Sequence, residues 1–184
     1  MVEKPLAAGL RETGVEIREC TTVEELSGCV SLQREVFGLP EVEISPVRHF
    51  VVTMHAGGFT LGAFKSDRLV GFVLSVPAFV AGARAFYSHM AAVASDFQGV
   101  GLGAALKWAQ RERAIAEGVT YVKWTFQPVH ARNAFFNLEK LGHHPFIWLI
   151  FPQNVTKLLF SVAKKVLIFP QRVVCIKSNY FYFL

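Results

Sequence analysis

Residues 92–110, AVASDFQGVGLGAALKWAQ, contain the feature that decides the fold, a glycine-rich turn that leads directly into a helix. Gly99, Gly101 and Gly103 alternate, and the residues that follow have the apolar spacing of a helix. Such a turn exposes backbone N–H groups at the helix start, where the positive end of the helix dipole also points. The stretch therefore predicts a binding site for an anion, typically a phosphate.

Two well-known phosphate-binding motifs fit this stretch poorly. A P-loop places Lys and then Ser or Thr after its glycines, whereas Ala104 and Ala105 follow Gly103 here. A dinucleotide-binding G-x-G-x-x-A pattern is formally present at Gly99, Gly101 and Ala104. That pattern should follow its strand directly and precede an acidic residue about 20 positions on, and the sequence lacks both features. The P-loop is excluded, and the dinucleotide motif lacks its usual context.

The elements around this stretch predict an α/β fold. A capping box at residues 21–25 opens a helix that ends at Gly38, and Pro46 opens a second helix that ends at residues 57–58. The expected order is β-α-α-β-β-β-α-β-α, which implies a mixed sheet flanked by helices, with an antiparallel meander in its middle. The predicted strands lie at 15–18, 59–66, 69–79, 84–93 and 119–126, with a turn at Asp67–Arg68 between the second and the third, and the last helix lies at 131–142.

Length and composition set the class of protein. A chain of 184 residues is long enough for one domain with a sizeable core. It is 52% hydrophobic, but no uninterrupted apolar run approaches the roughly 18–20 residues of a membrane-spanning helix. The first residues lack the apolar core of a secretion signal, and the three cysteines are an odd number without paired spacing. These features favour a cytoplasmic protein.

The net charge of +5 is concentrated at one end of the chain. Five of the 19 basic residues lie beyond Gly142, where there is no Asp or Glu, so the remaining 14 basic residues balance the 14 acidic ones. A nucleic-acid-binding protein usually carries its basic residues on the folded domain. Because residues 1–142 are neutral overall, we expect no nucleic-acid partner.

Residues 92–110 instead resemble the acetyl-CoA motif of the GNAT acetyltransferase superfamily. The motif consists of a valine, then Arg or Gln, two residues, Gly, one residue, and Gly or Ala. Ser95 stands where the family usually has proline, and RNAFFNLEKLG, residues 132–142, is similar to the last conserved helix of the family. SHMAAV and the sequence around this helix resemble a poorly characterised branch of predicted acetyltransferases. The motif positions are held by Val93, Gln98, Gly101 and Gly103.

This resemblance implies a domain over residues 15–144 that takes acetyl-CoA or another acyl-CoA as co-substrate. The glycine loop would receive the pyrophosphate, and the preceding strand would receive the pantetheine arm as though it were another strand. We expect no metal, because the six histidines lack the spacing of a metal site. By this resemblance the co-substrate contacts are expected at Ala91, Ala92, Val93, Gln98, Gly99, Val100, Gly101, Leu102, Gly103, Ala104 and Asn133.

The resemblance also implies direct attack of an amine on the thioester carbonyl, with a backbone N–H stabilising the oxyanion and a base removing the amine proton. His89, on the strand before the loop, is the candidate catalytic base, with a hydrogen-bonded strand histidine as its structural alternative; His130, Glu19 and Glu41 are weaker candidates. The family commonly protonates the departing thiolate with a tyrosine, and Leu138 stands at that position. The expected acceptor is a small molecule or a protein that carries an amine. The alternative is a non-catalytic acyl-CoA-binding or interaction protein.

Residues 145–184 match nothing in the family pattern and form an atypical basic, apolar tail. Three interpretations are open: a divergent end that forms strands, an interfacial segment that touches a membrane, or the product of a shifted reading frame or alternative exon. The abrupt loss of all acidic residues slightly favours the third interpretation.

Overall fold

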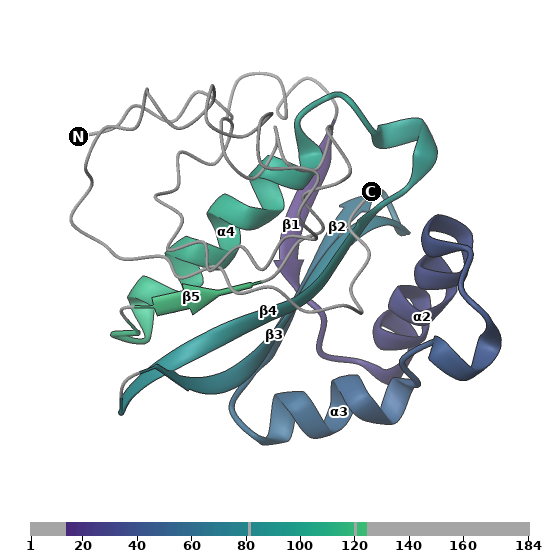
Figure 1. Cartoon of the computed structure of the whole chain (residues 1–184). Helices are drawn as coiled ribbons and strands as arrows, with labels where there is room; N and C mark the ends of the chain where they lie inside the picture. Colours follow the sequence, from purple (N-terminus) through teal and green to yellow (C-terminus); the bar gives the residue numbers. More distant parts are fainter. Residues whose placement is uncertain (1–13, 81, 120, 125–184) are drawn as a thin grey trace, which may run out of the picture.

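The computed structural model describes residues 14–80, 82–119 and 121–124. Within these ranges the chain forms one sheet with helices on both sides (Figure 1). Asn133, His130, Leu138, the helix expected at 131–142 and the tail at 145–184 lie outside the described residues. The elements are β1 (Val15–Glu19), α2 (Val23–Phe37), the 3-10 turn η1 (Glu41–Glu43), α3 (Val47–His55), β2 (Phe59–Lys65), β3 (Arg68–Val80), β4 (Ala83–Val93), the 3-10 turn η2 (Ser95–Phe97), α4 (Leu102–Ala116) and β5 (Tyr121–Lys123).

The five described strands are arranged in the order β1-β2-β3-β4-β5. Neighbours are antiparallel from β1 to β4, and β4 and β5 are parallel. Parallel neighbours need a crossover connection, and α4 supplies it. Helices α2 and α3 cover one face of the sheet, and α4 covers the other (Figure 1). The mixed α/β architecture expected from the element order is therefore confirmed over the described part of the chain.

Local sequence signals explain where the helices begin and end. Thr22 caps α2, since its side-chain oxygen accepts a hydrogen bond from the N–H of Glu25 at 3.2 Å. The Glu25 carboxylate accepts in return from the N–H of Thr22, which completes the expected capping box. Gly38 ends the helix in the left-handed region, at φ 59°. Pro46 precedes α3 as its N-cap residue, as predicted from its position.

The turn between β2 and β3 differs slightly from the expected one. Lys65 pairs with Arg68, so Ser66 and Asp67 form a two-residue loop one position earlier than predicted. Ser66 has φ 53°, the one positive value of a non-glycine residue in the described ranges. The register of the hairpin, rather than the turn preference of Asp67, sets this position.

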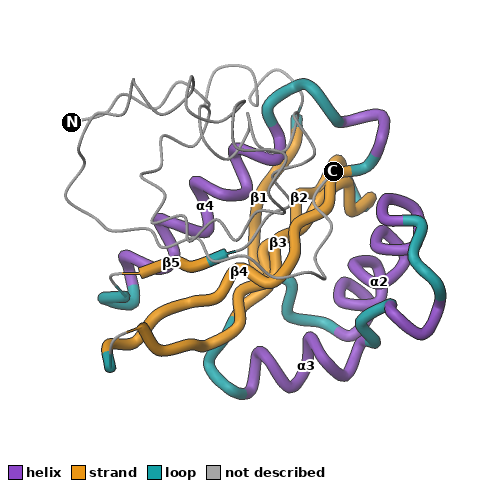
Figure 2. The backbone as a smooth tube through the Cα atoms, in the orientation of Figure 1, coloured by secondary structure: helices purple, strands orange, loops and turns teal. Residues whose placement is uncertain are grey.

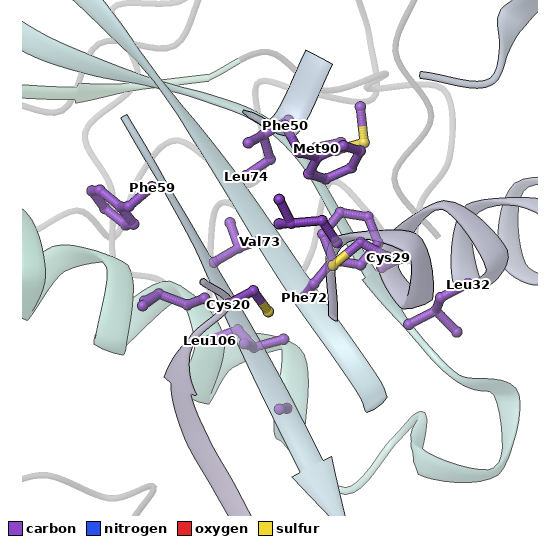
Figure 3. Packing of buried hydrophobic residues seen from close by; sticks show 14 of the residues in the cluster. Cys20, Cys29, Leu32, Phe50, Phe59, Phe72, Val73, Leu74, Met90 and Leu106 are labelled. Atoms are coloured by element: carbon purple, nitrogen blue, oxygen red, sulfur yellow. The ribbon is translucent and has the colours of Figure 1, made fainter. Parts of the chain in front are cut away.

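The sheet face under α2 and α3 forms an apolar, aromatic core. Phe50 of α3 and Phe72 of β3 are fully buried, with ring centroids 5.8 Å apart in an edge-on arrangement. Leu74 and Met90 pair across β3 and β4 and lie on the same side (Figure 3). Cys29 of α2 joins this cluster. Several aromatic rings thus anchor the two helices to the sheet.

The other face approaches α4 closely. A Cβ on Gly71 of β3 would lie 3.1 Å from Leu106 Cδ1 and 3.6 Å from Leu102 Cδ2. Both leucines belong to α4 and are fully buried. The absence of a side chain at Gly71 therefore allows the first two turns of α4 to lie directly on the sheet.

Candidate functional site

The connection between β4 and α4 forms the expected glycine turn. After Val93 the chain makes the short η2 turn, and Gly99 and Gly101 then adopt φ 81° and 90° (Figure 2). Such values are strained for residues with a Cβ and ordinary for glycine. Gly101 is the N-cap residue of α4, so its conformation sets the direction of the helix start.

The start of α4 has the properties of an anion site. Gly101 has no side chain to cap the helix, and no acidic residue occupies its first turn. The first hydrogen bond of the helix runs from the N–H of Ala105 to the carbonyl of Gly101 at 3.0 Å, so the N–H groups of residues 102–104 point out of the helix start. The loop before them is open to solvent, and Val100 is 52% exposed. These N–H donors and the positive end of the helix dipole suit a phosphate.

Two side-chain interactions hold the loop in place, and the sequence predicted neither. The Gln98 amide donates to the carbonyl of Val93 at 3.0 Å and so ties the loop to the end of β4. Asp96 accepts from both terminal nitrogens of Arg68, at 2.7 and 3.3 Å, which ties η2 to the start of β3. The Arg68 guanidinium, mainly through these hydrogen bonds, lowers the pKa of Asp96 below its usual range. In this structure the side chain of Gln98 therefore positions the loop through its hydrogen bond to Val93.

Strand β5 pairs with only part of the edge of β4 that leads to the loop. The described register pairs residues 85–87 of β4 with residues 121–123 of β5. Along residues 88–93 of β4, the described part of the chain shows no strand partner on this edge. Ala91, Ala92 and Val93 pair with β3 on the other side. They lie on the open stretch, immediately before the loop.

A β-bulge interrupts β4 at His89. Leu74 pairs with Met90 and Ser75 with Ser88, so His89 is the extra residue. Its ring meets the ring of His49 on α3 edge-on, with centroids 5.1 Å apart. Burial, and secondly the proximity of His49, lowers the pKa of His89 to about 4. Burial also lowers the pKa of His49.

The two histidines are therefore neutral near pH 7. A neutral imidazole can accept a proton, but the low pKa of His89 makes it a weak proton acceptor. His49 was missed by sequence reasoning, because its proximity to His89 depends on how α3 packs against the sheet.

The two carboxylates considered as alternative bases are already engaged. Glu41 forms an ion pair with Arg34, which lowers its pKa mainly through their hydrogen bond. Glu19 forms an ion pair with Arg113 of α4 at 3.4 Å. Both therefore contribute to contacts between elements. Neither approaches the β4 bulge in the interactions that the structure records.

A second group of residues that was not predicted from the sequence lies between α4 and the sheet. Lys107 and Gln110 of α4 are buried, as are Ser75 and Ser88, which pair across β3 and β4. The Lys107 ammonium donates to Ser88 Oγ at 2.5 Å, and the Gln110 amide donates to Ser75 Oγ at 2.7 Å. The sequence nevertheless contained a sign of this polar cluster. Lys107, Gln110 and Ala114 share the spacing of one helix face, so two polar residues stand where apolar ones are usual.

The described residues contain no group of three or more His, Cys, Asp or Glu side chains arranged to hold a metal. Within the same ranges, no helix has the length and apolar character that crossing a membrane requires.

Comparisons with known proteins agree with this geometry. The sequence model of the "Acetyltransferase (GNAT) family" matches residues 24–143. A search of curated protein sequences found no significant match.

Solved structures with the same fold are distant in sequence. An aminoglycoside acetyltransferase, meta-AAC0020, from an uncultured soil metagenomic sample, solved with trehalose, is 16% identical with a TM-score of 0.61, covering 70% of this chain and 87% of that one. The aminoglycoside N-acetyltransferase AAC(6')-Iy in complex with CoA is 14% identical with a TM-score of 0.58, covering 77% and 95%. A transcriptional regulator from Bacillus halodurans C-125 is 20% identical with a TM-score of 0.58, covering 71% and 93%. At these identities the comparison shows a shared fold.

Proposed function

Because the chain belongs to the GNAT acetyltransferase family, we propose that it binds acetyl-CoA or another acyl-CoA and transfers the acyl group to an amine. The observation that carries the proposal is the start of α4. It combines an exposed glycine turn with outward-pointing N–H groups, next to an edge of β4 that the described strands leave open. An acyl-CoA has a pyrophosphate for the first feature and an extended arm with two amide groups for the second.

Each part of the co-substrate then has expected contacts. The pyrophosphate would accept hydrogen bonds from the loop and from the N–H groups of Leu102, Gly103 and Ala104. The amides of the arm would pair with the main chain of Ala91, Ala92 and Val93, in the manner of an added strand. Main-chain recognition of this kind explains why small side chains suffice along β4. Asn133 stays a predicted contact.

In the proposed reaction, the acceptor nitrogen bonds to the thioester carbonyl carbon, the C–S bond breaks, and its electron pair leaves on sulfur. The β4 bulge turns main-chain groups out of the regular ladder, and one of their N–H groups is the proposed donor to the oxyanion. The acceptor would enter on the side of α3, where neutral His49 and His89 lie. His89, directly or through water, is the proposed acceptor of the amine proton. The acceptor itself is an amine of a small molecule or of a protein.

Calorimetry on the full chain tests the proposal, with acetyl-CoA, NADH and ATP as separate ligands. We expect binding of acetyl-CoA and no comparable binding of NADH or ATP. Binding of NADH together with indifference to CoA would overturn the proposal in favour of the dinucleotide motif. Release of free thiol from acetyl-CoA over a panel of amines, aminoglycosides included, then tests transfer. Binding without thiol release for any amine would favour the non-catalytic alternative.

Gly101→Val gives the sharpest test of the loop. The variant should lose detectable CoA binding, because a β-branched residue is strained at φ 90° and would crowd the ligand. Val100→Ala is the matched control, since Val100 is exposed and adjacent, and it should bind normally. Unchanged affinity in a folded Gly101→Val protein would show that the loop is only a turn. Circular dichroism checks the folding of both variants.

A further inference from the structure

Lys107 places a positive charge inside the protein, between α4 and the sheet. The residue is 7% exposed. The ammonium donates to Ser88 Oγ at 2.5 Å and to Gln110 Oε1 at 3.4 Å, and lies 4.9 Å from the centroid of the Trp124 ring. Burying a charge is unfavourable unless its surroundings compensate for lost water. A lysine held in this way is therefore a candidate for a role in the site.

The strand register shows where this charge lies. The described pairing of β4 with β5 ends at Tyr87 and Lys123. Ser88 and Trp124 are the next residues on the two strands, and the Lys107 ammonium contacts both. The charge is thus located at the point where the described pairing of the two parallel strands stops.

The described contacts of the ammonium replace part of the water that it loses on burial. Two oxygen atoms accept hydrogen bonds from it, and the face of an indole ring attracts a cation. Gln110 presents its oxygen to Lys107 because its nitrogen donates to Ser75. The titratable neighbours Tyr87 and Lys123 flank Ser88 and Trp124, so side-chain alternation directs them to the opposite face. His89 lies beside His49, also on the α3 side.

The next step rests on the proposed function. With the pyrophosphate at the start of α4, the pantetheine arm would run back along β4 from Val93 towards Ser88. Five steps along a strand span about 16 Å. The arm has about thirteen chain atoms between the phosphate and the end of the thiol, equivalent to roughly four extended residues, or about 14 Å. The sulfur would therefore come to within one residue of Ser88, close to the point where pairing with β5 ends at Tyr87.

We propose that the Lys107 ammonium binds the sulfur of CoA and stabilises the thiolate that leaves during acyl transfer. When the C–S bond breaks, the sulfur gains an electron pair and a negative charge, and the ammonium beside it lowers the free energy of that anion. Lys107 keeps its protons, and the thiolate is protonated after release by water. A nearby lysine is a recognised cause of a lowered thiol pKa.

The pKa of the CoA thiol bound to the full-length protein tests this proposal without an acceptor. The thiolate absorbs in the ultraviolet, so absorbance is followed against pH, and the same titration with desulfo-CoA is subtracted to remove the cysteines of the protein. An ordinary thiol has a pKa of about 8.5. We expect the bound thiol of the wild-type complex to titrate at least about one pH unit below free CoA, a tenfold change in its ionisation.

Variants then assign the effect to Lys107. Lys107→Met and Lys107→Gln should each return the bound thiol to the pKa of free CoA, whereas Lys107→Arg should keep most of the shift. Lys123→Met is the matched control, because it removes a charge one residue from Trp124 on the opposite face, and it should leave the shift unchanged. Calorimetry of CoA binding and a melting curve accompany each variant.

The outcomes separate the two proposals. A wild-type protein that binds CoA without lowering its thiol pKa overturns the role of Lys107 and leaves the proposed function intact, and this result needs no variant to fold. An unchanged shift in folded Lys107→Met or Lys107→Gln overturns it in the same way. A wild-type protein that does not bind CoA overturns the proposed function itself, and the inference with it.

Discussion

The two faces of the sheet bury different chemistry. Between the sheet and the helices α2 and α3, the buried side chains are aromatic, aliphatic or thiol groups, centred on Phe50 and Phe72. Where this layer buries polar side chains, they are the neutral ones of Gln33, Thr53 and Thr60, and Gln33 exchanges hydrogen bonds with the backbone of Ser45. Between the sheet and α4, the structure buries apolar side chains such as Leu102 and Leu106, and beside them it buries a lysine and a glutamine against two serines.

This difference separates a layer held by apolar burial from a layer that also contains a polar cluster. Burial of apolar side chains stabilises the packing of helices on a sheet, because it removes apolar surface from water. This contribution does not depend on the relative orientation of the groups that come into contact. A buried polar cluster contributes little net stability, because each group exchanges water for a protein partner. The α4 face nevertheless keeps such a cluster below the β4 edge.

The largest effect is expected from Phe72→Ala on the apolar face. Phe72 is fully buried against Phe50, and truncating such a ring typically lowers the free energy of unfolding by about 3–5 kcal/mol. Urea unfolding followed by circular dichroism measures the loss. Phe79→Ala is the control, because Phe79 is 75% exposed and its truncation should stay within about 0.5 kcal/mol. Equal effects of the two variants would contradict the assigned core.

The apolar face should also be sensitive to acid through His89. Its folded pKa of about 4 lies below the ordinary value of 6.5, so the unfolded chain binds this proton first. Stability from this residue is complete above pH 6.5 and is lost as pH falls towards 4, up to about 3 kcal/mol. His89→Gln should flatten the dependence of unfolding free energy on pH between 7 and 4. Parallel curves for wild type and variant would refute this assignment.

A smaller effect is expected from Ser75→Ala on the α4 face. The change leaves the Gln110 amide without the oxygen that accepts from it at 2.7 Å, which costs about 1–3 kcal/mol. Replacing both partners, as Ser75→Ala with Gln110→Leu, should recover part of the loss, since neither polar group then stays buried, while Lys107 loses its 3.4 Å contact to Gln110 Oε1. Urea unfolding of the single and double variants measures this. A double variant less stable than the single one would show that the cluster contributes more than pairwise hydrogen bonds.

The smallest effect on stability is expected from Asp96→Asn in the loop. Asp96 and Arg68 are both about half exposed, so their ion pair is screened by water and salt. Because the pKa of Asp96 is lowered in the folded state, its contribution is present above the ordinary carboxyl pKa and is lost as the pH falls below it. The difference from wild type should therefore vanish at low pH and at high salt. Melting curves over a pH and salt series check it, and a difference that persists in acid would point to another cause.

Features governed by nearby residues could be predicted from the sequence. The capping box of α2 involves Thr22 and Glu25, and the glycine turn needs only the residues at 99–103, so both follow from short spacings. Local sequence patterns also predicted the order of helices and strands, and that order predicted the mixed sheet.

Features governed by strand register could not be predicted. The bulge at His89 depends on how β4 aligns with β3, and a shift by one residue would exchange its faces. The contact between Lys107 and Ser88 depends on this register. It also depends on the close packing of α4 against the sheet, which Gly71 permits. Pairs far apart in sequence, such as Arg68 and Asp96, also leave no local pattern.

The two ties of the glycine loop have a consequence for how fast and how tightly a ligand is captured. Gln98 fastens the loop to β4, and Asp96 fastens it to the start of β3. A loop ordered in advance loses little conformational entropy when a ligand arrives, so more of the contact energy is retained as affinity. On the proposed function, association of acyl-CoA would then need no slow rearrangement of this loop, and its rate would be set by diffusion and orientation.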